Sequence, residues 1–349
     1  MKNDFAQRTG VIYPIIQAPM LGVSTPEMAA AVSNEGGLGS LAIGGLSPER
    51  SQTLIRQTKN LTGKPFAVNL FTHTIPPYEE SKMVPMRRLL LEMAKERGYA
   101  LAESELQNFR FYTYKEQIDV LIKEDIKLIS FTFGMLDDAT IQLFKSNGCT
   151  LIGTATSLKE ARLLQESGID MIVAQGLEAG GHRGSFLDDE PLPQVGLFSL
   201  LPQLAKQVHV PVIAAGGIRD AQTMRAAFDL GAAAVQVGTL FIASKESDAI
   251  PAWQQQLSGV DATDILLTRA FSGRWARGIR NEMMERIEAS GIPIPPYPIQ
   301  NSLTAAFRKL AQQANDSSYT NLWAGQSAGD APADNTRDIF RFLVKELKG

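Results

Sequence analysis

The feature that most constrains the fold is a series of eight short apolar runs separated by segments with helical patterns. The runs are 11–20, 38–44, 65–71, 127–134, 150–156, 171–176, 211–217 and 234–241. Several of the following segments open with good helix caps, namely Thr25 and Ser47, each before a proline, and Ser157. Because most runs are apolar on both faces, we expect parallel strands covered by helices. Repeated strand–helix units of this kind predict an α/β fold, a (β/α)8 TIM barrel.

Two regions fall outside this repeat. Residues 72–114 are too long for one crossover and too polar for a core, so we expect a helical insertion after the third strand, with a helix at about 82–98. The third barrel helix would follow at about 115–124. Residues 251–349 contain amphipathic patterns around the turn-rich IPIPPYP. We expect a barrel of residues 1–71 and 115–250, with residues 251–349 as a C-terminal helical cap that packs on its mouth and contributes to the substrate site.

Composition excludes several classes of function. A formal net charge of −3 gives no electrostatic case for binding nucleic acid. No apolar run is long enough to cross a membrane, and the first residues lack the pattern of a secretory signal. The single cysteine, Cys149, excludes an intrachain disulfide, and with only three histidines we expect no metal site. We expect a cytoplasmic protein that binds a small molecule; the sequence does not predict an oligomeric state.

The seventh and eighth runs, PVIAAGGIRD and AAAVQVGTLF, both end in glycine before a helical pattern. Adjacent strands that end in this way bring several backbone N–H groups to one rim, where a phosphate can bind. Candidate phosphate-binding residues are Gly216, Gly217, Gln236, Val237, Gly238 and Thr239. The alternative is that these glycines serve only the geometry of two turns.

Other polar residues follow the strand ends, where barrel enzymes place their active sites. Asn69 and Gln175 end the third and sixth runs, and carboxamides suit a ring that both donates and accepts hydrogen bonds, such as a flavin edge. They could instead bond only to loop backbone. After Gln175 comes a loop whose glycines, Gly180, Gly181 and Gly184, let the backbone approach a ligand.

The same loop carries His182, which we expect to act in proton transfer because an imidazole on this rim can meet a bound ligand. Glu178 could orient His182 or could be an exposed acid, and the sequence leaves both open. His73, after the third run, is a secondary candidate. His209 precedes the seventh run, at the opposite end of the barrel, and we expect it to be structural. Motifs for dinucleotide folds, nucleotide hydrolases and serine hydrolases are absent.

Four strings, taken in order, resemble the nitronate monooxygenases, formerly called 2-nitropropane dioxygenases. They are PIIQAPMLGVSTPEMAAAVSNEGGLGSL, AQGLEAGGHRGSF, PVIAAGGI and AVQVGTLF, and WAGQSAG at 323–329 is similar to the family's C-terminal motif. The long EAGGHRG form together with WAGQ looks most like the class I branch. The resemblance implies an FMN-dependent enzyme that oxidises alkyl nitronates, such as propionate 3-nitronate, with O2 to nitrite and a carbonyl compound through a flavin semiquinone. A nitronate detoxification role would follow.

The resemblance also implies roles for individual residues. Asn69, Gln175 and Gly180 would contact the flavin, and Met20 would lie in a turn over its ring. Gly217 and residues 236–239 would hold the phosphate, in agreement with the glycine-ended runs. His182 would bind the nitronate or take the α-proton of a neutral nitroalkane. Trp323 and Gln326 would close the flavin pocket.

Two other functions remain open at this point. One is an NAD(P)H-dependent flavin reductase of enoyl thioesters or quinones on the same barrel. The other is a non-redox phosphate-binding barrel, an isomerase or a lyase, for which the glycine-ended strands alone would be sufficient.

Overall fold

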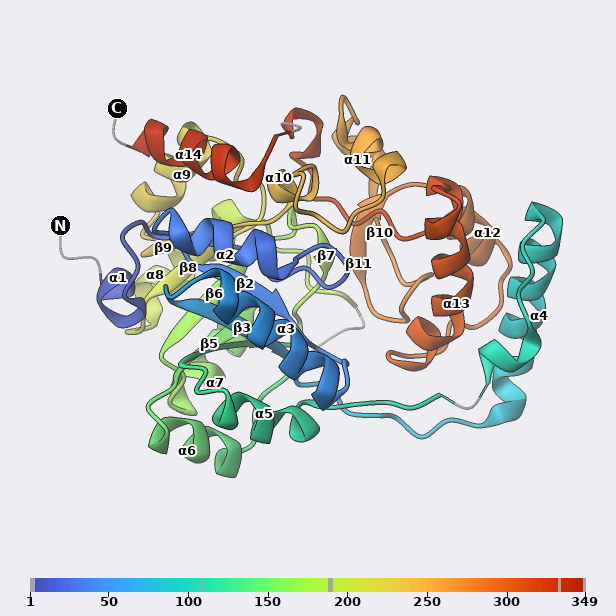
Figure 1. Ribbon diagram of the computed structural model, residues 1–349, viewed down its shortest axis with the longest axis horizontal. Helices are drawn as coiled ribbons and strands as arrows, with labels where there is room; N and C mark the ends of the chain where they lie inside the picture. The colour runs from blue at the N-terminus through green and yellow to red at the C-terminus, as the bar shows by residue number, and fades with distance from the viewer. Residues whose placement is uncertain (1–3, 108, 188–190, 332–333, 348–349) are drawn as a thin grey trace.

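Eight parallel strands form the main sheet, in the order β1-β9-β8-β6-β5-β4-β3-β2. The strands are β1 (Ile15–Gln17), β2 (Gly39–Ala42), β3 (Phe66–Phe71), β4 (Leu128–Thr132), β5 (Thr150–Ala155), β6 (Met171–Gln175), β8 (Val212–Ala215) and β9 (Ala234–Val237). A parallel bridge between Ile16 and Leu38 brings the two ends of the sheet together. The computed structural model, which describes residues 4–107, 109–187, 191–331 and 334–347, thus confirms a nearly closed (β/α)8 barrel (Figure 1).

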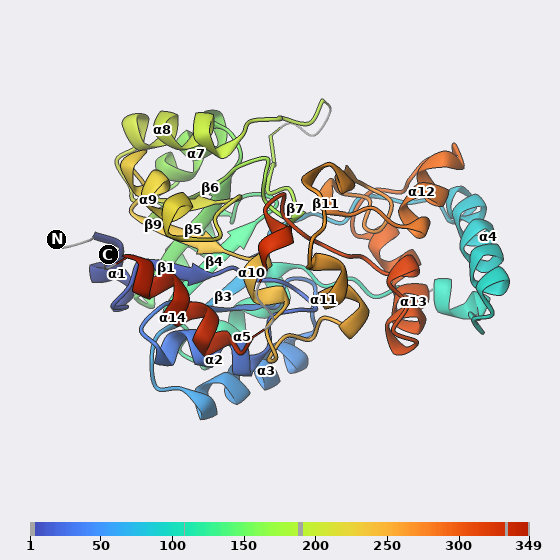
Figure 2. The same ribbon diagram turned by 90° about the horizontal axis from the view of Figure 1, so that it is seen from above.

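Helices cover the outside of this barrel (Figures 1 and 2). They are α2 (Pro26–Asn34), α3 (Pro48–Leu61), α5 (Ile118–Lys123), α6 (Asp138–Ser146), α7 (Leu158–Glu166), α8 (Leu197–Gln207) and α9 (Ala221–Asp229). Phe5 of α1 (Asp4–Thr9) packs instead against strand residues such as Ile16 and Ile213, and the short α10 (Thr239–Ile242) begins at the carboxyl end of β9. The caps predicted from sequence form: the side chains of Thr25, Ser47 and Ser157 accept hydrogen bonds from the first turns of α2, α3 and α7.

Some boundaries differ from the predicted ones. The first strand covers only residues 15–17 rather than 11–20, because Pro14 and Pro19 lack the N–H that a strand must donate on both sides. The eighth strand ends at Val237 instead of running to residue 241, since residues 239–242 form α10. The helix predicted at 115–124 is divided into a 3-10 turn at residues 114–117 followed by α5.

The insertion after β3 contains α4 (Glu80–Arg97), close to its predicted position. In both views α4 lies beside α12 (Glu282–Ala289) and α13 (Ile299–Gln313), away from the barrel (Figures 1 and 2). One apolar cluster joins the three helices, and it includes Met83, Met86, Leu90, Met93, Met283, Met284, Ile287, Leu303 and Phe307. The insertion and part of the C-terminal segment therefore share a second core.

Residues 251–349 are not wholly helical, and this corrects the predicted helical cap. After α11 (Pro251–Leu257), the strands β10 (Ile265–Thr268) and β11 (Ala276–Ile279) form an antiparallel pair. β11 also pairs with β7 (Gly181–His182), a strand inside the sixth barrel loop. The prediction failed here because each strand is short and the partner of β11 lies about ninety residues earlier in the chain, which no local pattern reveals.

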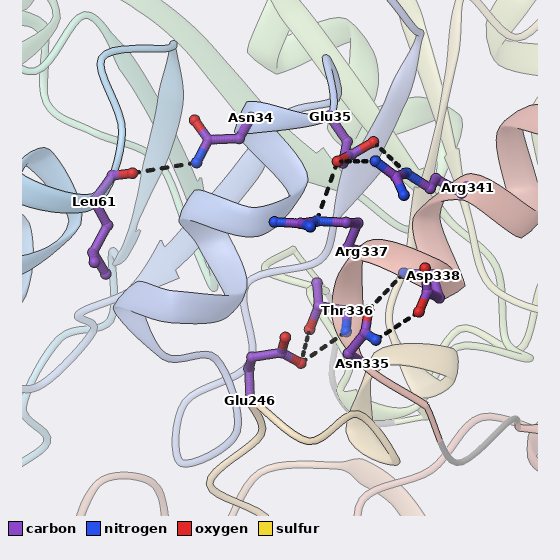
Figure 3. A network of polar contacts seen from close by, with 9 residues as sticks. All are labelled: Asn34, Glu35, Leu61, Glu246, Asn335, Thr336, Arg337, Asp338 and Arg341. Atoms are coloured by element: carbon purple, nitrogen blue, oxygen red, sulfur yellow. Dashed lines mark hydrogen bonds and ion pairs between the residues drawn. The ribbon is translucent and has the colours of Figure 1, made fainter.

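The last helix, α14 (Thr336–Leu347), packs on the outside of the barrel (Figure 3). Arg337 and Arg341 pair with Glu35, at N–O distances of 3.3 and 2.8 Å. At the start of the helix, Glu246 accepts hydrogen bonds from the backbone N–H and the hydroxyl of Thr336, at 2.7 and 2.8 Å. Phe340 is fully buried beneath these contacts. None of the described helices is long and apolar enough to cross a membrane.

Candidate active site

A cavity opens at the carboxyl ends of the barrel strands, where the sequence predicted the site. Of the predicted residues, twelve line it: Met20, Asn69, Gln175, Gly180, Gly181, His182, Gly216, Gly217, Gln236, Gly238, Thr239 and Trp323. Two others lie behind its wall. The Val237 side chain is buried, and its carbonyl accepts a hydrogen bond from the Ala18 N–H. The backbone N–H of Gln326 donates to the Glu178 carbonyl at 3.0 Å.

The glycine turns after β8 and β9 form one end of the cavity. Gly216 and Gly217 both adopt positive φ angles, +113° and +71°, which side-chain-bearing residues rarely adopt. Within the described part of the chain, the backbone N–H groups of Gly216, Gly217 and Gly238 have no hydrogen-bond acceptor. Several free N–H groups at one rim can bind an anion, and the phosphate site stays a prediction.

The sixth loop forms the central wall and is closely braced. The carboxamide of Gln175 donates to the His182 carbonyl at 2.9 Å and accepts from the Gly184 N–H at 2.8 Å. A Cβ placed on Gly180 would lie 2.5 Å from the backbone of Ala324 and Gly325, so only glycine permits this close approach. Gln175 therefore bonds to loop backbone, as its structural alternative predicted, while it also lines the cavity.

Three arginines hold the carbonyl groups of the same loop. Arg183 donates to the carbonyls of Gly176 and Gln175, at 2.6 and 3.2 Å. Arg277 donates to the Leu177 carbonyl at 2.9 Å, and Arg274 donates to the Arg183 carbonyl at 3.3 Å. Because these guanidinium groups bond to backbone on both sides of His182, they fix the loop and make the surroundings of the imidazole electropositive.

His182 lies in β7, opposite Ala276 of β11. Its Nε2 atom is 2.8 Å from the Ser272 hydroxyl oxygen. Burial, together with the nearby positive charges of Arg274 and Arg308, lowers the pKa of His182 to about 3. The imidazole is therefore neutral at physiological pH.

Glu178, which could have oriented His182, has another role. Both its carboxylate oxygens accept from the Leu197 N–H, at 3.0 and 2.9 Å. The preceding residue, Gly196, has no side chain to cap α8, so Glu178 supplies the missing acceptor and a favourable negative charge at the helix N-terminus. The residue that contacts the imidazole is Ser272, which the sequence did not single out.

The two other histidines differ in their surroundings. His209 is exposed, at the opposite end of the barrel from the cavity. His73 is only 6% exposed, and its ring meets Tyr297 edge-on with 4.9 Å between the ring centres. Burial lowers the pKa of His73 to about 4, so it too is neutral at physiological pH. His73 lies behind Tyr297 and does not line the cavity.

Aromatic side chains surround His182. The ring centres of Trp323, Phe133, Tyr297 and Phe71 lie 5.4, 5.3, 6.1 and 6.5 Å from the imidazole. All four rings line the cavity, so the space beside the imidazole has a low dielectric constant.

Several lining residues come from α13 and the segments beside it, and the sequence analysis missed them. They include Tyr297, Asn301, Arg308 and Asn321. One signal could have found them: Asn301, Thr304 and Arg308 are spaced i, i+3 and i+7 on an amphipathic helix, which places a polar stripe on one face.

Comparison with known proteins agrees with this geometry. A model of the family described as nitronate monooxygenase matches residues 3–339. The chain belongs to the nitronate monooxygenase family. A probable nitronate monooxygenase of Staphylococcus aureus (strain JH9) is 39% identical over 347 residues, which cover 99% of this chain and 97% of the relative. One from Staphylococcus saprophyticus is 41% identical over 319 residues, covering 91% of this chain and 89% of the relative.

Solved structures extend the likeness to three dimensions. A nitroalkane oxidase from Streptomyces ansochromogenes superposes with a TM-score of 0.88 at 35% identity, covering 97% of this chain and 96% of that one. FabK from Thermotoga maritima superposes with a TM-score of 0.77 at 28% identity, covering 100% of this chain and 96% of that one. This nitronate monooxygenase family member is thus an oxidoreductase, and the family depends in general on a flavin.

Proposed function

We propose that this enzyme uses FMN to oxidise alkyl nitronates with O2, releasing nitrite and a carbonyl compound. The observation that carries the proposal is a neutral, half-buried imidazole in a cavity, one end of which is a turn with free backbone N–H groups. Family membership supports it. A cytoplasmic role in removing nitronates fits a chain with a single, buried cysteine.

The cavity wall offers hydrogen-bonding groups that suit both the phosphate and the ring of FMN. The free N–H groups of Gly216, Gly217 and Gly238 would hold the phosphate. The Gln236 carboxamide makes no hydrogen bond with the described residues, and Asn69 uses only its amino group, to Ser130 at 2.9 Å. Both would therefore have hydrogen-bonding capacity for the ring. When bound, FMN supplies the redox centre that accepts electrons from the nitronate and passes them to O2.

His182 would assist as a neutral group. A general base is most effective when its pKa lies near the working pH, and a pKa of about 3 makes His182 a poor base for the α-proton of a nitroalkane. A nitronate has already lost that proton. The imidazole would instead orient the nitronate, held in place by Ser272 and by the β7–β11 pairing. The structure therefore favours nitronates over neutral nitroalkanes as substrates.

The aromatic wall would keep water away from the reacting atoms. Phe71, Phe133 and Trp323 enclose the space beside His182, so the electrostatic interactions of a bound anion are stronger there than in water. The bracing of the sixth loop by Gln175 and the arginines would preserve this arrangement during turnover.

The test is direct. The purified protein should be yellow, release FMN on denaturation, and form nitrite from propionate 3-nitronate or a simple alkyl nitronate under air. His182→Asn should retain FMN and lose most of this activity. Colourless protein, or yellow protein that forms no nitrite from any nitronate, would refute the proposal. Anaerobic bleaching by NADH, without nitrite formation from nitronates, would identify a flavin reductase instead.

A further inference from the structure

The lining of the cavity is unusual in its charge. Of the described residues that line it, only Arg219 and Arg308 carry a full charge, and none is an aspartate, glutamate or lysine. Arg219 follows the glycine turn, and its Nε lies 3.5 Å from the carboxylate of Asp220. Arg308 is on α13, on the side of the cavity that carries His182. The cavity thus has a second cation beyond the one beside the phosphate-binding turn.

Arg308 is held by neutral groups only. Its Nε donates to the Thr304 hydroxyl at 3.1 Å, and its Nη1 donates to the Asn321 carboxamide oxygen at 2.7 Å. Its Nη2 donates to the carbonyl and the carboxamide oxygen of Asn301, both at 2.9 Å. These four bonds use four of the five N–H donors of a guanidinium group, and one donor on Nη1 is left.

No carboxylate of the described residues forms an ion pair with Arg308. Burial lowers the pKa of Arg308 to about 10, so the group stays charged at neutral pH. A half-buried cation without a counter-ion is costly, and such groups are normally paired when the site is complete. An anion that enters the cavity would supply the missing counter-charge.

The position of Arg308 indicates which anion. Arg308 lines the cavity together with His182 and Tyr297, whose ring centres are 6.1 Å apart. Its charge also acts on the imidazole, where it contributes to the lowered pKa of His182. His182 is itself neutral and cannot balance a negative charge there. A nitronate group, with its negative charge shared by two oxygens, matches a guanidinium edge held by fixed acceptors.

We propose that Arg308 binds the nitronate group itself and supplies the positive charge that balances it. This inference rests on the proposed function, and it makes Arg308 the residue that selects nitronates, as a class, over neutral nitroalkanes. Asn301, Thr304 and Asn321 are positioning residues, because their side chains accept hydrogen bonds from the guanidinium and so fix its orientation.

Removing the guanidinium should weaken binding of every nitronate. Truncating one partner of a buried, hydrogen-bonded charge pair lowers affinity by at least about 30-fold. In Arg308→Met, KM for both propionate 3-nitronate and propyl-1-nitronate should rise by this factor or more. Arg308→Lys should recover part of the loss, because it keeps the charge without the planar geometry. Arg286→Gln serves as a control, since Arg286 pairs with Glu96 on the outside of α12.

The two nitronates separate the possible readings. They differ only in a carboxylate that replaces a methyl group. A rise in KM for propionate 3-nitronate alone would show that Arg308 binds this distal carboxylate, and it would overturn the proposal. Unchanged KM values for both nitronates would also overturn it. Equal losses for both, with Arg286→Gln unchanged, would support it.

A binding measurement distinguishes failure of this inference from failure of the proposed function. Nitrate is a planar oxyanion that resembles the nitronate head group, and its binding to the flavin-loaded protein can be followed by the flavin spectrum. We expect a nitrate Kd that is at least about 30-fold weaker in Arg308→Met than in the wild type. Equal nitrate affinity would refute the role of Arg308 even in a protein that oxidises nitronates normally.

Discussion

Two buried histidines should make the stability of this enzyme fall as the pH is lowered. Burial lowers the pKa of His182 to about 3 and that of His73 to about 4. In the unfolded chain both imidazoles titrate at about 6.5. Below this pH the unfolded state binds more protons than the native state, so the free energy of unfolding decreases as the pH falls. Above about pH 6.5 both groups are neutral in either state, and this contribution is constant.

The size of the effect follows from these values. Each histidine lowers the free energy of unfolding by about 1.4 kcal/mol for every pH unit below 6.5. At pH 5.0 this is about 2 kcal/mol for one histidine and about 4 kcal/mol for the pair. The loss from His73 levels off near pH 4, and that from His182 near pH 3. A decrease of this size is a large fraction of the stability of an ordinary domain.

Urea unfolding at constant FMN concentration, between pH 7.5 and 5.0, measures the decrease. In His73→Gln, the decrease in the free energy of unfolding between pH 7.5 and pH 5.0 should be smaller than in the wild type by about 2 kcal/mol. His182→Asn should remove a similar amount. If both variants kept the full pH dependence of the wild type, the histidines would not be buried in neutral form, and the account of His182 would fail.

Contacts at and beside the cavity lead to three further predictions. Gly180→Ala would place a methyl group against the Ala324 backbone, so we expect FMN retention to drop at least about tenfold, measured by flavin released on dilution. Ser272→Ala should lower kcat/KM for nitronates about tenfold without changing FMN affinity, and Ser272→Thr should restore it, because the hydroxyl that contacts His182 returns. Thr239→Val removes a hydroxyl that accepts a backbone N–H at 2.9 Å, so FMN affinity should fall more than the rate of the fully loaded enzyme; equal FMN affinity would contradict this.

Much of the site could be predicted because barrel geometry is regular. Parallel strands with Asn69 and Gln175 near their carboxyl ends, and with glycine turns after them, must bring those residues to one rim, and the cavity is found there. Helix starts at Thr25 and Ser47 were also predictable, since capping depends on a few adjacent residues.

The rest depends on contacts between distant segments. The partner of His182 is Ser272, which lies beside it because β7 pairs with β11, about ninety residues later in the chain. Gln326 was predicted from its motif alone to close the pocket. The hydrogen bond that it makes with Glu178 uses its backbone N–H and not its side chain. Arg308 looked like an ordinary helix residue until the fold placed it in the cavity wall.

The central claim is tested most directly by nitrite formation. The purified, FMN-loaded protein is mixed with propyl-1-nitronate in air-saturated buffer, and nitrite and propanal are measured over time beside His182→Asn at equal flavin concentration. We expect nitrite and propanal to appear together in the wild type and to fall by about 10²-fold in the variant, because the nitronate is no longer oriented. Wild-type protein that retains its flavin yet forms no nitrite, or a variant as active as the wild type, would contradict the account.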